Sequence, residues 1–217
     1  MAYPVMTFIA APDTLEIKEK EITKYLWYCG QKPEGESLKL INKCIEEVKK
    51  VMSAKACYSR FPVEVYPDGE TVKLPYGEVK SDVFSRHIAG CSEVWIFAAT
   101  IGAGFDRLIQ RKRHISMSET AVLQATGAAA VEAVCDALFD KLEKETAKEG
   151  KYLRLRFSPG YGKLSLDNQK GIFDLLTPAK FTGITLMDSM IMAPEKSVTA
   201  IIGISDVPGR KTYETEK

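Results

Sequence analysis

Six consecutive apolar residues, Val94 to Ala99, constrain the fold more than any other segment of the chain. A strand with one exposed face alternates apolar and polar residues, whereas an unbroken apolar run of this length is typical of a strand buried on both faces. Such a strand must lie inside its sheet and be covered on each side. The run therefore predicts the central strand of a layered fold.

Further strands are predicted on either side of this run. Val63 to Leu74 has alternating apolar residues interrupted by a Pro-Asp-Gly turn, which is typical of a hairpin. In Tyr152 to Phe157, apolar residues alternate with Tyr152, Arg154 and Arg156, which predicts a strand buried on one face. On that pattern, Arg154 and Arg156 point the same way. A last strand is expected over Ser197 to Ile204.

Helical periodicity and capping residues predict the rest of the fold. The longest helix should start at Ser116-x-x-Glu119, a capping box, and reach Lys148. Other helices are expected at the following places: Ile17 to Tyr28 with Gly30 as a stop, Ser37 to Ala54, a short helix capped by Ser81, one after Thr100 to Gly104, and one from Ser165. We expect an α+β fold in which a mixed, largely antiparallel sheet carries helices on its faces, as one domain over residues 1–217.

Charge and composition exclude several classes of protein. The 217 residues are 45% hydrophobic and 27% charged, as in an ordinary globular domain. Thirty Lys and Arg against 29 Asp and Glu give a formal charge of +1, which provides no global attraction for nucleic acid or an anionic membrane. Runs such as Val94 to Ala99 are too short to span a bilayer, and residues 1–12 lack a leader pattern. We expect a cytoplasmic protein.

The cysteines and histidines do not suggest a metal or catalytic centre. Five cysteines is an odd number, and no Cys-x-x-Cys occurs, which argues against disulfides and a zinc knuckle and favours buried apolar roles. His87 and His114 are isolated in the sequence. No triad or carboxylate pair stands out, so we predict neither a metal ligand nor a catalytic residue.

Arg154 and Arg156, followed by Pro159, Gly160 and Tyr161, form the main candidate binding segment. Two guanidinium groups on one strand face would suit a carboxylate or phosphate, although such pairs are more often solvated or bound to a neighbouring helix. Pro159 and Gly160 end the strand in a turn, because proline cannot donate to a ladder and glycine tolerates positive φ. Tyr161 is then accessible to a ligand.

The long helix carries Glu132, Asp136 and Asp140 at i, i+4 and i+8. An exposed acidic stripe explains Asp136 and Asp140. Glu132 lies among small and apolar neighbours, where an unpaired carboxylate is unfavourable, so it needs a cationic partner. That partner is either an arginine of the 154–156 strand or a ligand ammonium. Nearby Gly127 to Ala130 would let another backbone or a flat ligand approach closely.

Two other motifs have ordinary explanations. Gly102-x-Gly104 lacks the third glycine of a dinucleotide-binding fingerprint, so close packing of strand onto helix explains it better than phosphate binding. Arg111 to His114 is a basic run at an expected helix end, where cations are favoured and solvated.

Several motifs in one order resemble the activation domain of cobalamin-dependent methionine synthase. The resemblance is closest over residues 154–203 and weakest in the N-terminal third. The residues that carry it are Arg156-x-x-Pro159-Gly160-Tyr161, Lys170, Leu175-Leu176, Thr182-Gly183-Ile184-x-Leu186 and Met192-x-Pro194-x-x-Ser197-Val198.

That resemblance implies binding of S-adenosylmethionine beside a corrinoid, so that an inactive cob(II)alamin is remethylated with one electron, commonly from flavodoxin. Arg156 would bind the ligand carboxylate, the backbone of Ser158 to Gly160 would contact the nucleoside or amino-acid part, Tyr161 would separate ligand and corrinoid, and Glu132 would lie near the amino-acid end. A guanidinium facing a carboxylate also complements the charges of that ligand.

Departures from the family pattern leave alternatives open. Residues 162–167 replace the family's Pro-x-Cys-Pro-x-His run, and the chain lacks an Asp-x-His-x-x-Gly corrinoid motif. We therefore expect an accessory subunit, not an enzyme alone, that acts on cobalamin held by a separate methionine synthase or other corrinoid protein. The alternatives are a docking module without ligand binding and an S-adenosylmethionine methyltransferase for a small molecule.

Overall fold

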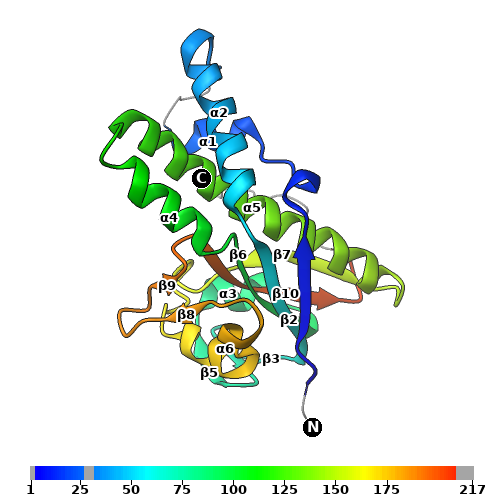
Figure 1. Cartoon of the computed structure of the whole chain (residues 1–217). Coiled ribbons are helices and arrows are strands. Elements are labelled where there is room, and N and C mark those ends of the chain that lie inside the picture. The colour runs from blue at the N-terminus through cyan, green and yellow to red at the C-terminus, as the bar shows by residue number, and fades with distance from the viewer. Residues whose placement is uncertain (1–2, 27–31, 209–217) are drawn as a thin grey trace.

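The computed structural model describes residues 3–26 and 32–208. A five-stranded antiparallel sheet in the order β1-β2-β6-β10-β7 forms the middle layer (Figure 1). Its strands are β1 (Met6–Ala10), β2 (Ala54–Pro62), β6 (Cys91–Thr100), β10 (Ser197–Ser205) and β7 (Tyr152–Phe157). Small antiparallel sheets are formed by β3 (Glu64–Val65), β4 (Thr71–Leu74) and β5 (Gly77–Lys80), and by β8 (Thr185–Leu186) and β9 (Met192–Ala193).

Helices cover both faces of the large sheet. One face packs against α1 (Glu19–Tyr25), α2 (Gly35–Val51), α4 (Ala103–Lys112) and α5 (Met117–Ala147). The other packs against α3 (Asp82–His87), α6 (Asn168–Leu176), the small sheets and the segment of α7 (Pro178–Phe181). Figure 1 shows these two layers on either side of the strands. The predicted α+β class is confirmed.

The apolar run Val94 to Ala99 lies in β6, the middle strand, as predicted. Ile96 and Ala98 belong to the core on the α3 and α6 side, whereas Trp95 and Phe97 belong to the core under α5. Both sets are almost fully buried. The run is continuous because each face of this strand contributes to a separate core.

Helix α5 is the central element of the larger core. By length and composition it could cross a membrane, but more than half of its most apolar 18 residues are buried inside the structure, which is usual for a core helix. At Gly127, its small segment gives space to a side chain of α4. A Cβ on Gly127 would lie 2.3 Å from the Phe105 ring, so the glycine makes room for that side chain. Ser116 caps the helix by accepting a hydrogen bond from the Glu119 amide at 3.2 Å.

Two strands of the large sheet were not predicted. Residues 6–10 form the edge strand β1, and the helix expected over Ser37 to Ala54 ends at Val51, before β2. The first part of β2 has small residues and a lysine rather than β-branched or aromatic ones, so its strand state comes from pairing with β1 and β6. The first helix is also shorter than expected, and its predicted stop at Gly30 lies outside the described residues.

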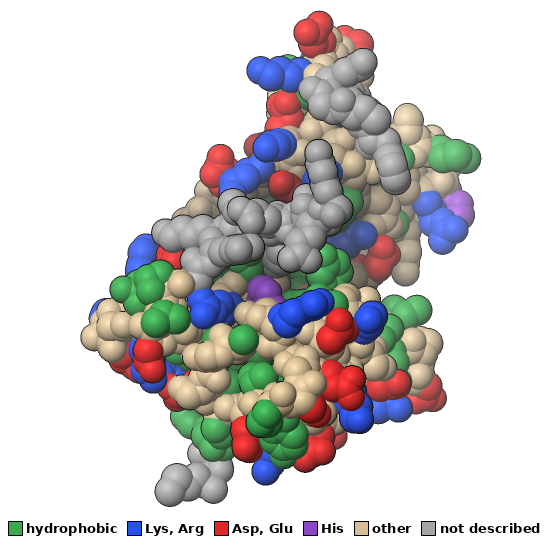
Figure 2. All heavy atoms as spheres, turned by 180° about the vertical axis from the view of Figure 1, so that it is seen from behind, with side chains coloured by type: hydrophobic (Ala, Val, Ile, Leu, Met, Phe, Trp, Pro, Cys, Tyr) green, Lys and Arg blue, Asp and Glu red, His purple; other side chains and the backbone are tan. Residues whose placement is uncertain are grey.

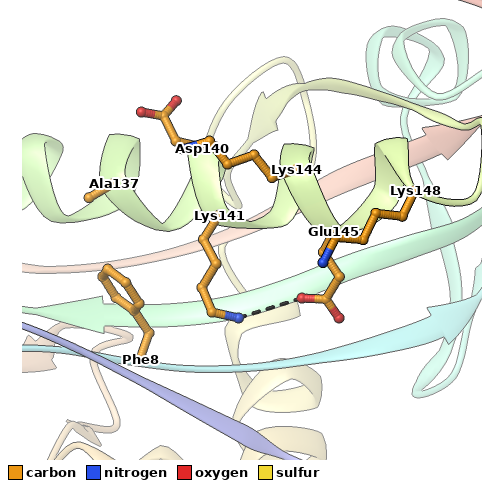
Figure 3. A pocket seen from close by; sticks show the side chains of 7 residues that line it. All are labelled: Phe8, Ala137, Asp140, Lys141, Lys144, Glu145 and Lys148. Atoms are coloured by element: carbon orange, nitrogen blue, oxygen red, sulfur yellow. Dashed lines mark hydrogen bonds and ion pairs between the residues drawn. The ribbon is translucent and has the colours of Figure 1, made fainter.

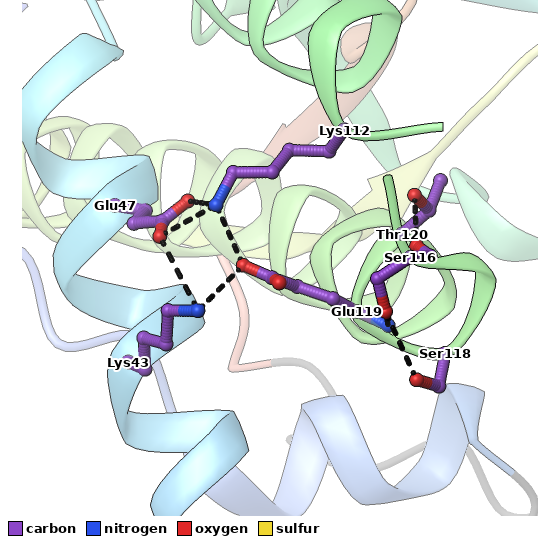
Figure 4. A network of polar contacts seen from close by, with 7 residues as sticks. All are labelled: Lys43, Glu47, Lys112, Ser116, Ser118, Glu119 and Thr120. Atoms are coloured by element: carbon purple, nitrogen blue, oxygen red, sulfur yellow. Dashed lines mark hydrogen bonds and ion pairs between the residues drawn. The ribbon is translucent and has the colours of Figure 1, made fainter. Parts of the chain in front are cut away.

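The basic run at residues 111–114 is only partly a solvated helix end. Lys112 binds Glu119 at 2.6 Å and Glu47 at 2.8 Å, and Lys43 binds Glu119 at 2.9 Å (Figure 4). The Glu119 carboxylate therefore joins α2, α4 and α5, whereas a full capping box would have directed it back to the Ser116 amide. Arg111, Arg113 and His114 are exposed, as expected.

The Gly102-x-Gly104 turn is explained by close packing, as predicted, but the contact is between the start of α4 and the end of α2 rather than between a strand and a helix. Gly102 has φ +81°, and a Cβ on Gly104 would lie 2.1 Å from the Val51 carbonyl oxygen. Any larger residue at position 104 would separate α4 from α2.

Gly104→Ala should therefore destabilise the protein by about 1–3 kcal/mol. Helix propensity alone predicts that the same substitution stabilises the protein, by up to about 1 kcal/mol. Urea unfolding followed by circular dichroism distinguishes the two. Glu143→Ala, on the exposed side of α5, is the control and should change little. A Gly104→Ala variant as stable as the parent would show that this contact is not tight.

Candidate functional site

A β-bulge in the middle of β7 determines where its two arginines point. Ile202 of β10 pairs with Arg156 and Ile204 pairs with Leu153, so two residues of β7 face the single residue Gly203. One extra residue reverses the alternation of side chains beyond it. Arg154 and Arg156 therefore lie on opposite faces of the sheet, and the prediction that they point the same way is wrong.

Arg154 packs on the α3 side of the sheet. Its stem would lie 3.1 Å from a Cβ on Gly203, and its Nη2 donates to Ser205 Oγ at 3.2 Å. The Val207 carbonyl oxygen accepts from Nη1 at 3.4 Å. The hydrogen bonds of Arg154 to Ser205 and Val207 thus join β7 to the last described residues, on the face opposite to α5.

Arg156 points to α5, where it meets the acidic residues of that helix. Its Nη2 lies 3.0 Å from both Glu132 Oε2 and Asp136 Oδ1. Lys18, just before α1, adds a second cation at 3.7 Å from Asp136. The Glu132 carboxylate thereby has a cationic partner, as its apolar surroundings predicted. Of the two predicted alternatives, the structure shows an arginine of the strand.

The Arg156 side chain is only 23% exposed, but charged and polar side chains surround it. Burial lowers the pKa of the Arg156 guanidinium, but the neighbouring Cys135, Glu132 and Asp136 together outweigh burial and raise that pKa overall. The Tyr25 phenol of α1 belongs to the same cluster. Its pKa is raised by burial and then by Glu132 and Glu21. Arg156 and Lys18 face Glu132 and Asp136, and an incoming zwitterion would leave this set of two cations and two anions balanced.

The segment after β7 forms a closed turn that holds Tyr161 outward. The Gly160 amide donates to the Leu164 carbonyl oxygen at 2.7 Å, and the Tyr161 amide donates to that of Ser158 at 3.2 Å. Ser81, the cap of α3, donates to the Gly162 carbonyl oxygen at 2.6 Å. The turn is thus fixed to a helix start, which restricts its motion.

Tyr161 is accessible, as predicted, with 62% of its surface exposed. Its ring packs edge-on against Phe157 with ring centroids 5.5 Å apart. Pro159 is buried, Ser158 is half-buried and Gly160 is exposed. On the face shown in Figure 2, side chains of both charge signs are interspersed with hydrophobic ones over the described surface, which agrees with the small net charge.

Sequence reasoning missed three members of this cluster. Asp136 is exposed as expected, but it also binds Arg156, and its position one turn after Glu132 was the available signal. Tyr25 and Lys18 lie far away in sequence, and only the packing of α1 against α5 brings them here. Asp140 is exposed and is not an ion-pair partner of Arg156.

A cavity of about 760 Å³ lies elsewhere, between α5 and the strand β1 at the opposite edge of the sheet from β7. Its lining contains none of Arg156, Ser158 to Tyr161 or Glu132. Within residues 3–26 and 32–208, no three His, Cys, Asp or Glu side chains gather as a metal site would require.

Comparison with known proteins gives the family. Residues 85–208, more than half of the chain, match the model of the vitamin B12-dependent methionine synthase activation domain. The chain belongs to this family. The match begins within α3 and contains β6, α5, β7 and the segment through β10, and therefore all the candidate site residues on α5 and β7.

Structure comparison extends the likeness of this activation domain to nearly its whole length. A solved structure described as the crystal structure of the MetH reactivation domain bound to AdoHcy superposes with a TM-score of 0.70 at 18% sequence identity. The match covers 98% of this chain and 81% of that one. At this identity it shows a shared fold. No curated protein matches the sequence.

His87 provides a pH test of the β7 bulge. Its Nε2 donates to the Leu155 carbonyl oxygen at 2.8 Å, within the bulge, and burial lowers its pKa below the usual value near 6.5. The unfolded chain therefore binds this proton at a higher pH than the folded one. Stability from this group is complete above pH 6.5 and is lost as the pH falls through the range below it.

We expect the melting temperature to drop on acidification from pH 7.5 to 5.5, and the drop to be smaller in His87→Gln. The measurement is thermal unfolding by circular dichroism at several pH values. His114→Gln, at an exposed position, is the matched control and should follow the parent curve. If all three proteins have the same pH profile, His87 does not take up a proton on unfolding.

Proposed function

We propose that this activation domain binds S-adenosylmethionine at Arg156, Glu132 and the turn from Ser158 to Tyr161, and presents its methyl group to a corrinoid on a separate chain. Family membership supports the general role. The single observation that carries the site is the ion pair between Arg156 and Glu132, which join strand and helix at 3.0 Å.

An exchange of ion pairs explains how the ligand enters. The amino-acid end of S-adenosylmethionine carries a carboxylate and an ammonium. The ligand carboxylate takes the place of Glu132 at the Arg156 guanidinium, while the ligand ammonium binds Glu132. One ion pair is replaced by two, and Asp136 and Lys18 keep the cluster neutral. Charge-assisted bonds to Arg are bidentate and directional, which gives specificity for an α-amino acid.

The edge position of β7 suits the remainder of the ligand. No described strand pairs with the outer side of β7, so its backbone is accessible beyond Arg156. A nucleoside lying along this edge reaches the backbone of Ser158 to Gly160 and then Tyr161, which the turn holds outward. The AdoHcy in the similar structure supports a ligand of this chemistry, since it is S-adenosylmethionine without the methyl group.

Catalysis by this domain is positioning, because the reacting groups belong to the ligand and the corrinoid. A cobalamin-dependent methionine synthase or other corrinoid protein supplies the cobalt that accepts the methyl group, and a flavodoxin-like donor supplies one electron. The domain's own residues bind the ligand, orient the sulfonium methyl towards the exposed face at Tyr161 and shield it from water. The proposal places this reaction in the cytoplasm.

A docking module without ligand binding is the second candidate function. The observation that favours it is that Arg156 is held by Glu132 and Asp136 together, so a ligand must compete with two carboxylates. The small-molecule methyltransferase loses its support, because the Gly102 turn packs on Ser53 and α2.

Arg156→Ala should weaken S-adenosylmethionine binding by roughly 30-fold or more, since the ligand carboxylate loses its charged partner. Isothermal titration calorimetry measures this. The β7 bulge supplies a matched control. Arg154→Ala removes the same side chain from the other face of the same strand and should change the affinity by less than about threefold. Equal losses in the two variants would indicate damage to β7, and unchanged binding in Arg156→Ala would remove the site.

A second experiment tests the partner. Cob(II)alamin absorbance is followed in a purified corrinoid protein with S-adenosylmethionine and an electron donor. We expect loss of the cob(II) bands to depend on this activation domain and to slow at least tenfold with Tyr161→Ala, which removes the side chain proposed to face the corrinoid. Ligand binding that persists without any acceleration would contradict the proposed reaction while leaving the binding site intact.

A further inference from the structure

The strand β1 forms the edge of the sheet opposite to β7, and its outer side is unpaired among the described residues. The strand reads Met-Thr-Phe-Ile-Ala, with no charge and no proline. Natural edge strands usually carry charged residues or proline, which prevent another strand from pairing with their free backbone groups. Ile9 at 72% exposure is also one of the most exposed large apolar side chains in the described chain.

Helix α5 lies over the space beside this edge strand. The cavity of about 760 Å³ has Phe8 of β1 on one side and α5 side chains on the other (Figure 3). An added strand lies about 4.8 Å from its neighbour, so a segment paired with β1 would run along this cavity. Its side chains would alternate between the α5 side and the side of Ile9.

Charge in the cavity favours an acidic occupant. Lys141, Lys144 and Lys148 line it with Asp140 and Glu145, so lysines exceed carboxylates by three to two. Lys141 is already engaged, since its Nζ lies 2.6 Å from Tyr58 Oη and 3.5 Å from Glu145. In residues 3–26 and 32–208, neither Lys144 nor Lys148 has an ion-pair partner. These two cations are one helical turn apart.

We propose that β1 and the cavity bind an extended acidic segment of a partner protein by strand addition, with carboxylates facing Lys144 and Lys148 and apolar side chains beside Ile9. Alternation follows from the period-2 geometry of a strand. A second copy of this chain fits less well, because pairing two β1 edges would bring two lysine-lined cavities together. The surface is separate from Arg156, so it serves to hold a partner and not the ligand.

The first test uses a fluorescent peptide of about nine residues in which glutamate and valine alternate. Fluorescence anisotropy should show that this alternating peptide binds. A control peptide of the same composition, with its glutamates grouped together, should bind at least fivefold more weakly. Hydrogen exchange should show added protection of residues 6–10 in the complex. Binding without that protection, equal binding of the two peptides, or no binding of the alternating peptide each overturns the proposal.

Variants locate the contact. Lys144→Ala with Lys148→Ala should weaken peptide binding roughly tenfold. Arg111→Ala with Arg113→Ala removes two exposed cations near the other end of α5 and should have no effect. Ile9→Thr keeps a β-branched residue and should weaken binding severalfold by removing apolar contact. Equal losses in the two double variants would show attraction to net charge alone and would contradict strand addition.

Two further outcomes would overturn the proposal by assigning the surface to a different occupant. Inorganic pyrophosphate that displaces the peptide at micromolar concentration would assign the cavity to small anions. A dimeric mass by light scattering that becomes monomeric in Ile9→Thr would assign the edge to a second copy. We expect a monomer and no displacement by pyrophosphate at constant ionic strength.

Discussion

The β-bulge that places two residues of β7 opposite Gly203 is the constraint on which the candidate site depends. It turns Arg156 to α5 and leaves Arg154 on the other face. Gly203 permits this geometry, since a Cβ there would lie 2.7 Å from Cys91 Sγ and 3.1 Å from the Arg154 stem. Without the bulge, the guanidinium of Arg156 would not meet Glu132. Local backbone irregularities of this kind often redirect a side chain at a functional site.

The layered fold keeps this arrangement rigid. Helix α5 packs along the sheet through a core of small and branched residues, and the close approach of Phe105 to Gly127 fixes its position. On the other face, Ser81 joins the start of α3 to the turn after β7. The two halves of the proposed ligand site, the charged cluster and Tyr161, are thus anchored to different layers that share one strand. An edge strand with firm support on both faces is well suited to bind an extended ligand along its open side.

Much of this arrangement followed from local sequence patterns. The run from Val94 to Ala99 identified the central strand, Ser81 and Ser116 identified helix starts, and the environment of Glu132 indicated a cationic partner. The bulge could not be predicted, because alternation over six residues gives no sign of an inserted position. The strand β1 was missed although Thr7, Phe8 and Ile9 favour strands, because a segment of only five residues is fixed by its pairing with β2. Tyr25 and Lys18 were missed for a related reason, as tertiary packing alone places α1 beside the acids of α5.

The central claim is that Arg156 and Glu132 together hold the amino-acid end of the ligand. A crystal structure of the activation domain with S-adenosylhomocysteine tests it most directly. The account predicts the ligand carboxylate within hydrogen-bond distance of the Arg156 guanidinium and the ligand ammonium on Glu132, with the nucleoside along the edge of β7. A ligand bound elsewhere, with Arg156 still joined to both Glu132 and Asp136, would contradict it.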